Sequence, residues 1–308
     1  IKCVGFSSTA ETCVFLDKYN EPLCKVIAWM DTRATDICKE LREKIGENAI
    51  FELCGNSLQP SYTTAKILWY KQNMSEVYEK TYKILQSNSY IAYKLTGKMT
   101  QDLSQGYGLH CFDMHSGTWN EEMCEKFGIS MDILPVIHAC HDVIGGVTEK
   151  AAKESGLAVG TPVVAGGLDA ACGTLGVGVL NVGETQEQGG QAGGMSICTD
   201  TYKADKRLIL SYHVVPNRWL LQGGTTGGGG VMRWLEREFA DYEREEGKKV
   251  GKSSLELFNE IAEKVAPGSD GVIFLPYMSG ERSPIWDTNA KGIYYGLDFR
   301  KRKGHFVR

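Results

Sequence analysis

The sequence predicts an α/β fold divided into two domains. Short apolar segments with the composition of strands alternate along the chain with segments that have the periodicity of helices. The 308 residues correspond to two domains at roughly 100–200 residues each. Hydrophobic residues make up 42% of the chain, which is enough for a sizeable core in each domain.

The first half of the chain is predicted element by element. Three segments have the composition of short strands, namely residues 3–8, 12–17 and 25–31. The stretch NEP at residues 20–22 marks the turn between the last two of them. Three further segments have helical spacing of apolar residues, namely 34–45, 63–69 and 80–95. A short amphipathic helix is expected at 148–155, followed by Gly156 and an apolar strand at 161–167.

The second half continues the alternation. A helix is expected to begin at Asp169, directly after the strand at 161–167. Residues 184–224 are rich in strand-forming residues, and glycine-rich turns interrupt or follow them at 189–194 and 223–230. Two helices and a final strand are predicted after these turns, at residues 231–239, 254–265 and 272–277 respectively.

Composition excludes several classes of protein. The formal net charge of -4 argues against a nucleic-acid-binding surface. No apolar run approaches the roughly 18 residues of a membrane-spanning helix, so no membrane partner is expected. The ten cysteines include no C-x-x-C pair and are expected to be free thiols of a cytoplasmic protein. The chain starts at Ile1 with a strand-like segment, and we expect it to be a segment of a longer protein.

One aspartate stands out in the stretch GGLDAACGTLGVGV at residues 166–179. Asp169 is its single charge, and five glycines surround it. One interpretation is an N-cap, because aspartate is a favoured capping residue whose charge suits the helix dipole. The other is a functional carboxylate at the carboxyl end of a strand, where α/β proteins place ligands. The two roles are compatible, and the glycines would allow close approach of another backbone or of a substrate.

The glycine-rich loops QGGQAGG, at 188–194, and GGTTGGGG, at 223–230, suggest an anion-binding site. Such loops expose backbone N–H groups, and a helix N-terminus adds partial positive charge, so phosphate is a natural ligand. A flexible turn is the alternative for each loop. Neither the P-loop pattern nor the dinucleotide-binding pattern is present. The stretch HACHD at 138–142 lacks a second ligand pair at zinc spacing and is interpreted as a loop.

The order of several motifs resembles the FGGY family of carbohydrate kinases. The matching segments are GFSSTAETCVFLD, VIAWMDTRA, QPSYTTAKILWYKQN, KLTGKMTQDLS, GGLDAACGTLGVG, VMRWL and MSGERSPIWDTNAKGIYYGL. The resemblance implies a two-domain actin-like, ribonuclease-H-like ATPase fold, truncated at both termini. Residues 1–178 would form the sugar-binding domain without its first hairpin. Residues 179–308 would form the nucleotide-binding domain without its C-terminal part.

The resemblance implies roles for residues of the first domain. Asp169 would be the general base that accepts the proton of a sugar hydroxyl during phosphoryl transfer. Ala10, Glu11 and Trp29 would line the substrate site, with Glu11 accepting hydroxyl hydrogen bonds and Trp29 packing against the sugar. Asp102 falls in the family's Thr-Asp block, where capping of a loop is an equal alternative. Ala10 replaces the arginine of glycerol kinases, and Ser61 replaces their glycerol-contacting tyrosine, so the substrate remains open.

The resemblance also implies a nucleotide site in the second domain. Its residues would be Gly190, Gln191, Gly193, Thr226, Gly227 and Gly230. ATP and Mg²⁺ are the implied cofactors, and no protein ligand is assigned to the metal. The implied partners are ATP or ADP and a small sugar or polyol, and a homodimer is one alternative for the assembly. The family's usual Gly-Thr-Ser-Gly turn is Gly-Gln-Ala-Gly here, which favours one rival hypothesis, a sugar-binding sensor without catalysis. Another rival, an acyl-CoA-dependent activator, would need cysteine-ligated clusters.

Overall fold

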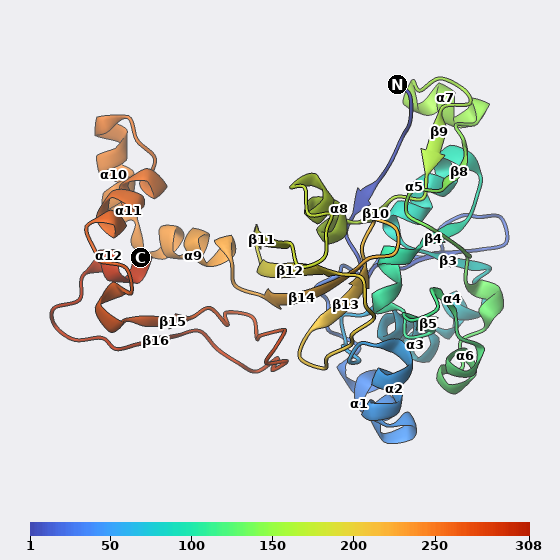
Figure 1. The fold of residues 1–308 in the computed structure, drawn as a ribbon, viewed down its shortest axis with the longest axis horizontal. Coiled ribbons are helices and arrows are strands. Elements are labelled where there is room, and N and C mark those ends of the chain that lie inside the picture. The colour runs from blue at the N-terminus through green and yellow to red at the C-terminus, as the bar shows by residue number, and fades with distance from the viewer. The chain divides into compact units, whose positions relative to one another are not determined.

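The chain folds into two units, each built from two stretches of sequence (Figure 1). The computed structural model describes residues 1–308. Unit 1 comprises residues 1–186 and 196–222, and unit 2 comprises residues 187–195 and 223–308. The chain therefore passes from one unit to the other three times.

The helices of unit 1 lie between its short strands along the chain. They are α1 (Thr35–Ile45), α2 (Glu47–Cys54), α3 (Thr63–Asn73), α4 (Ser75–Glu79), α5 (Ser87–Thr96), α6 (Glu121–Phe127), α7 (Glu149–Ser155) and α8 (Asp169–Gly176), with 3₁₀ turns η1 (Leu103–Gly108) and η2 (Met131–Ile133). The strands are β1 (Ser7–Ser8), β2 (Val14–Leu16), β3 (Lys83–Leu85), β4 (Thr100–Asp102), β5 (Phe112–Asp113), β6 (Thr118–Trp119), β7 (Val136–His138), β8 (Val143–Gly146), β9 (Pro162–Val164), β10 (Gly167–Leu168) and β13 (Ile209–Tyr212).

Three strands cross the boundary between the units, and the rest of unit 2 is mainly helical. The crossing strands are β11 (Thr185–Gly189), β12 (Gly193–Thr199) and β14 (Trp219–Thr225). Unit 2 also contains α9 (Gly229–Phe239), α10 (Asp241–Val250), α11 (Ser254–Glu263), η3 (Ser269–Gly271), β15 (Ile273–Leu275), β16 (Ile293–Tyr295) and α12 (Lys303–Val307). In Figure 1, α10, α11 and α12 gather beside one another.

Parallel pairing joins distant segments of unit 1. Strand β1 pairs with β10, with Ser7 opposite Gly167 and Ser8 opposite Leu168. Strand β4 pairs in parallel with β7. Antiparallel pairs join β2 to β3, β5 to β6 and β8 to β9. Because β1 and β10 run in the same direction, the residues that follow them emerge at one edge.

The C-terminal stretch of unit 1 is anchored to its first helices. Strands β13 and β14 pair antiparallel. Asn56, which follows α2 and is buried, donates its side-chain amide to the Leu210 carbonyl and accepts the Leu210 N–H, both at 2.9 Å. A buried amide that satisfies both backbone groups of one residue fixes this pairing without leaving a polar atom unpaired.

Each unit has its own apolar core. In unit 1, α5 and α7 pack beside β8 and β9 (Figure 1), and the buried side chains there are Ala92, Ile144, Val147, Ala151, Val163 and Ala165. In unit 2, α9, α11 and the residue between α9 and α10 share a core that consists of Val231, Leu235, Ala240 and Phe258. A capping box between Ser253 and Glu256 fixes the start of α11.

The predicted strand at 25–31 is wrong. This segment is irregular, and side chains of α3 satisfy its backbone instead of a strand partner. The Tyr70 hydroxyl donates to the Lys25 carbonyl at 2.8 Å, and the Lys66 ammonium donates to the Trp29 carbonyl at 3.3 Å. Ile27 is buried, but Val26 and Met30 are exposed, so the apolar composition of the segment does not mark a sheet position.

The predicted helix at 80–95 is only half correct. Helix α5 covers its second part, but residues 83–85 form strand β3. Ile84 lies opposite Phe15 of β2, and both are buried. Pairing with a strand about seventy residues earlier overrides the local helical spacing. The other predicted helices are confirmed, as α1, α3, α7, α8, α9 and α11.

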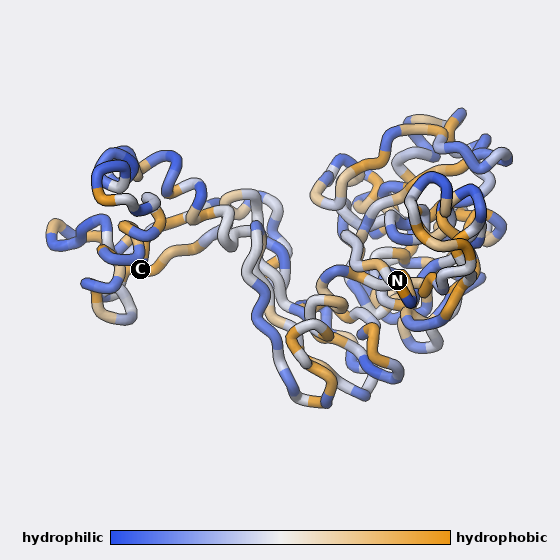
Figure 2. Tube along the Cα trace, turned by 90° about the horizontal axis from the view of Figure 1, so that it is seen from above, coloured by the Kyte–Doolittle hydropathy of each residue, from blue (hydrophilic) through white to orange (hydrophobic).

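All ten cysteines are free thiols, as the sequence predicts. No helix of the structure has the length and apolar character needed to cross a membrane. Figure 2 shows hydrophobic and hydrophilic stretches alternating along the whole trace.

Candidate active site

Asp169 is placed at the edge where β1 and β10 end. It is the first residue of α8 and directly follows Leu168 of β10. Gly166 has a φ of 82°, and a Cβ there would lie 2.8 Å from the Phe6 Cβ. A glycine is therefore needed at 166 for the close approach of the two strands, as the sequence suggests.

The carboxylate of Asp169 does not cap its helix in the usual way. The cap position belongs to Leu168, and the Asp169 carboxylate accepts the N–H of Ala170 at 2.7 Å. The side chain is exposed, although the surrounding chain removes part of its hydration. This desolvation raises the pKa of Asp169 above its ordinary value, and the Ala170 N–H opposes the shift. A raised pKa makes the carboxylate a better proton acceptor.

A buried hydrogen-bonded chain holds the strand end that precedes Asp169. Asp102 is 1% exposed and accepts the Ser104 hydroxyl at 2.5 Å, the Asn88 amide at 2.7 Å and the Gln105 N–H at 3.1 Å. The Ser104 hydroxyl in turn accepts the N–H of Leu168 at 2.8 Å. Asp102 thus caps η1, one of the two roles considered from the sequence, and through Ser104 it also fixes β10. Burial raises the pKa of Asp102, and its hydrogen bonds counteract the shift.

Glu11 lies three residues beyond the end of β1, at the same edge. It is 3% exposed, and its backbone has a φ of 59°, which is unusual for a glutamate. The Tyr107 hydroxyl donates to the Glu11 carboxylate at 2.7 Å. Ala10 beside it is also buried. The sequence did not single out Tyr107, and its only signal was its place between Gly106 and Gly108.

A buried lysine ties Glu11 and Trp29 to helix α3. The ammonium of Lys66 donates to the backbone carbonyls of Glu11 and Ala28, both at 2.8 Å, and to that of Trp29. Lys66 has no exposed surface, and burial lowers its pKa. Trp29 itself is half-buried. The structure therefore brings Ala10, Glu11 and Trp29 into one framework, in which Lys66 acts on backbone atoms rather than on carboxylates.

The two glycine-rich loops are in direct contact within unit 2. The N–H of Gly229 donates to the Gly190 carbonyl at 2.7 Å, and the N–H groups of Gly228 and Gly230 donate to the Gln191 carbonyl at 3.1 and 3.2 Å. A Cβ on Gly230 would lie 2.0 Å from the Gln191 amide nitrogen. The N–H groups at the start of α9 thus donate to carbonyls of the other loop. They can donate to a phosphate only if the two loops separate.

The glycine positions of these loops differ in their packing. A Cβ on Gly227 would lie 2.0 Å from the Pro276 carbonyl oxygen, and one on Gly193 would lie 3.2 Å from the Thr225 methyl group. A Cβ on Gly190 would meet only the Ala192 carbonyl oxygen, at 3.8 Å. Close packing therefore accounts for Gly227 and, less strictly, Gly193, whereas Gly190 is not constrained by its neighbours.

Thr226 faces a third segment rather than open space. Its hydroxyl donates to the Gly280 carbonyl at 2.5 Å, and its N–H donates to the Glu281 carboxylate at 3.1 Å. Glu281 belongs to the stretch GERSPIWD, to which the sequence gave no role. The candidate nucleotide residues therefore lie together in unit 2, at a junction of three loops.

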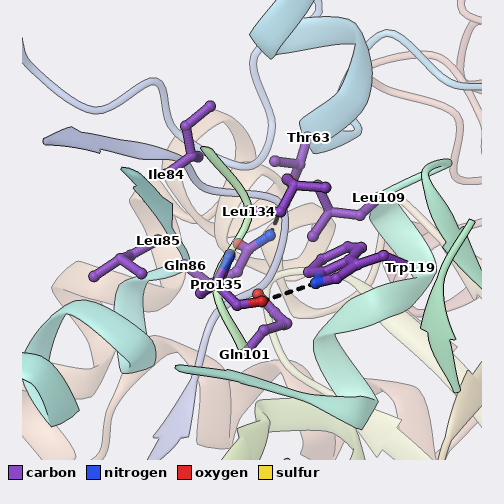
Figure 3. A pocket seen from close by; sticks show the side chains of 9 residues that line it. All are labelled: Thr63, Ile84, Leu85, Gln86, Gln101, Leu109, Trp119, Leu134 and Pro135. Carbon is purple, nitrogen blue, oxygen red and sulfur yellow. Dashed lines mark hydrogen bonds between the residues drawn. The ribbon is translucent and has the colours of Figure 1, made fainter. Parts of the chain in front are cut away.

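A small cavity lies elsewhere in unit 1, and its polar groups are already paired (Figure 3). The Trp119 indole donates to the Pro135 carbonyl at 2.8 Å, and the Gln86 amide donates to the Thr63 hydroxyl at 3.1 Å. The remaining walls include Ile84, Leu85, Leu109 and Leu134. These contacts give the cavity no polar group directed at a ligand.

Comparison with known proteins gives consistent relatives. The sequence is 28% identical to gluconokinase of Bacillus subtilis over 309 residues, which cover 100% of this chain and 60% of that protein. It is 32% identical to xylulose kinase of Lactococcus lactis over 310 residues, covering 99% of this chain and 59% of that protein. The structure matches that of ligand-bound xylulose kinase from Lactobacillus acidophilus with a TM-score of 0.88 and 27% identity, covering 100% of this chain and 61% of that one.

The chain spans about 60% of the length of the curated relatives it matches. The structural match confirms the predicted α/β fold of FGGY kinases. Residues 1–176 match the N-terminal domain of the FGGY family of carbohydrate kinases, and residues 194–308 match its C-terminal domain. The chain belongs to the FGGY family of carbohydrate kinases.

Proposed function

We propose that the complete gene product transfers the γ-phosphoryl group of ATP to a hydroxyl of a neutral sugar or polyol, with Asp169 as general base. Residues 1–178 contribute the sugar site and residues 179–308 the nucleotide site. The observation that carries the proposal is the placement of Asp169, an exposed carboxylate with a raised pKa at the edge where two parallel strands end. Membership of a carbohydrate kinase family supports it.

In phosphoryl transfer to a sugar hydroxyl, Asp169 accepts one proton. A sugar hydroxyl is a weak nucleophile, and a carboxylate within hydrogen-bond reach removes its proton as the bond to phosphorus forms. The partial desolvation that raises the pKa of Asp169 increases its basicity for this step. The buried chain from Asp102 through Ser104 to Leu168 keeps the strand end, and hence the start of α8, in a fixed position.

The nucleotide is held at the junction of the loops at 190–193 and 226–230. Their N–H groups at the start of α9 supply the donors that phosphate needs once they leave the carbonyls of Gly190 and Gln191. No group of three or more His, Cys, Asp or Glu side chains in this chain could hold a metal by itself. Mg²⁺ is usually bound through substrate phosphates and one or two carboxylates, and no carboxylate of this chain is assigned to it. The ion would neutralise charge on the phosphates.

The substrate we propose is a five- or six-carbon ketose or polyol. Glu11 accepts sugar hydroxyls and Trp29 packs against the carbon chain, while the small Ala10 leaves room beyond three carbons. Xylulose kinases and gluconokinases are both relatives of this chain. The buried carboxylate of Glu11 favours a neutral sugar, because an aldonate would bring a second negative charge beside it.

The test is a phosphorylation screen of the complete gene product with ketoses, polyols, aldoses, glycerol and gluconate, followed by Asp169→Asn. Asparagine has the same shape but cannot accept the proton, so turnover should be lost while sugar affinity changes little. Asp36→Asn is the control, since Asp36 is an exposed aspartate in the first turn of α1. Turnover of Asp169→Asn within tenfold of the parent would contradict the assignment of the base.

A sensor that binds sugar without transferring phosphate is the second candidate. The observation that favours it is the engagement of the loop amides at Gly228, Gly229 and Gly230 with carbonyls, together with the Gln191-Ala192 substitution in the turn. Sugar-dependent release of ADP by the complete gene product separates the two functions. Release supports the kinase, whereas sugar binding without release supports the sensor.

A further inference from the structure

The stretch GERSPIWD carries a buried carboxylate that contacts the glycine-rich loop before α9. Glu281 is 5% exposed. One of its oxygens accepts the Thr225 hydroxyl at 2.6 Å, and the other accepts the N–H groups of Thr226, at 3.1 Å, and of Arg282, at 2.7 Å. Thr225 is the last residue of β14, and Thr226 follows it within the glycine-rich stretch 223–230. A glutamate from one segment therefore binds two consecutive residues of another.

The segment around Glu281 is itself fixed. The N–H of Glu281 donates to the Asp287 carbonyl at 2.7 Å, so the segment closes on itself. The Gly280 carbonyl accepts the Thr226 hydroxyl. Gly280 has a φ of 78°, and a Cβ there would lie 2.7 Å from the Thr288 carbonyl oxygen, so glycine is required for this closure. The segment that carries Glu281 is therefore held in place by its own contacts, and Glu281 binds the loop from this fixed position.

The hydrogen bonds of Glu281 indicate a positioning role rather than metal binding or proton transfer. A carboxylate has about four lone-pair sites, and three protein donors occupy three of them here. Burial keeps the group away from solvent. Its bonds to the loop are of the charge-assisted type, which is stronger than a bond between neutral groups.

We propose that Glu281 is a positioning residue that holds Thr225 and Thr226 in the conformation that binds the nucleotide phosphates. This inference rests on the proposed function, because it assigns the loop at 226–230 to the nucleotide. Glu281 fixes the first two residues of the turn, and Pro276 contacts Gly227. The direction in which the following amides point depends on this start, so loss of Glu281 weakens nucleotide binding without touching the sugar site.

The experiment measures the dissociation constant for ADP by calorimetry, and kcat and KM for ATP and sugar, in the complete gene product. Glu281→Gln places an amide, which donates on one side, against groups that are themselves donors. We expect ADP affinity to fall about tenfold or more, with KM for ATP rising equally and KM for sugar unchanged. Thr225→Val, which keeps the branched shape but removes the hydroxyl, should shift ADP affinity in the same direction, and Thr225→Ser should restore most of it.

Glu243→Gln is the matched control. Glu243 is also 5% exposed and lies in unit 2, but its carboxylate binds Lys303 at 2.8 Å rather than the loop. A loss of stability alone would affect both glutamate variants, whereas the proposal expects only Glu281→Gln to lose ADP affinity. If Glu281→Gln does not fold, the Thr225→Val and Thr225→Ser pair gives the same comparison.

The outcomes separate this inference from the proposed function. A parent protein that binds ADP but phosphorylates no sugar contradicts the function, and the ADP affinities of the variants still decide the role of Glu281. An active parent whose Glu281 and Thr225 variants bind ADP as the parent does overturns the inference alone. A parent that binds no ADP overturns both.

Discussion

Replacing Ser104 by alanine should destabilise unit 1 strongly, because one hydroxyl makes two buried hydrogen bonds. Ser104 has no exposed surface, donates to Asp102 and accepts the Leu168 N–H. Loss of a hydrogen bond to a charged group costs about 1.5–3 kcal/mol, and an N–H left without an acceptor costs about 1–3 kcal/mol. Ser104→Ala should therefore lower the free energy of unfolding by about 2.5–6 kcal/mol. Turnover should also fall, since Leu168 directly precedes Asp169.

The cost should depend on pH in a defined direction. Burial raises the pKa of Asp102 in the folded state, so the folded protein binds its proton more tightly than the unfolded chain and is less stable when Asp102 is ionised. The Ser104 hydroxyl lowers that pKa, so its removal raises the pKa further. The difference between parent and variant should be largest above the raised pKa and should shrink as the pH falls through it.

Urea denaturation at pH 8 and at a pH below the raised pKa of Asp102 measures both effects, with Ser89→Ala as the control. Ser89 is 1% exposed, and its hydroxyl has no hydrogen-bond partner in the structure, so its removal breaks no hydrogen bond and should not lower the free energy of unfolding. If Ser104→Ala matched Ser89→Ala at both pH values, the hydroxyl of Ser104 would not hold β10, and the account of how Asp169 is positioned would be wrong.

Three further substitutions test other parts of the site in the complete gene product. Glu11→Ala should raise KM for sugar by a free energy of about 1.5–3 kcal/mol, and steady-state kinetics with the best ketose, alongside glycerol as a poor substrate, checks this; efficient use of glycerol would refute the substrate assignment. Gln191→Thr should change KM for ATP by less than about tenfold. Gly193→Val should raise KM for ATP far more, because its side chain adds bulk against Thr225. If Gln191→Thr proved the more damaging, the glutamine side chain itself would bind the nucleotide. Lys66→Met should lower the free energy of unfolding by about 2 kcal/mol or more, because three carbonyls lose their donor, and an unchanged urea midpoint would contradict that role.

Local patterns predicted the elements whose partners are close in sequence. The helices at 34–45 and 63–69 carry their own apolar faces, and both are present. The strand at 83–85 was missed because it exists only through its pairing with residues 14–16. The segment at 25–31 was misassigned because the side chain of Lys66, which is remote in sequence, satisfies its carbonyls. Non-local partners decided both errors.

In the candidate site, too, local features could be predicted from the sequence and contacts between distant residues could not. The position of Asp169 at a strand end could be predicted, since a polar residue after an apolar strand marks that edge. The contact of Tyr107 with Glu11 could not, because the two residues are 96 positions apart. The hydrogen bonds from the loop amides to the carbonyls of Gly190 and Gln191 could not be predicted either. A glycine-rich composition does not show which acceptor each N–H binds.

The threefold passage of the chain between the units has a consequence for synthesis and dissection. Unit 1 is incomplete until residue 222 has left the ribosome, because residues 196–222 belong to it. Until then the side chain of Asn56 lacks its two hydrogen bonds to the backbone of Leu210. A single cut after residue 186 removes residues 196–222 from unit 1 and leaves 187–195 with unit 2. Neither unit can therefore be obtained intact as one uninterrupted segment, and a proteolytic or genetic division of this protein has to sever the chain at three places.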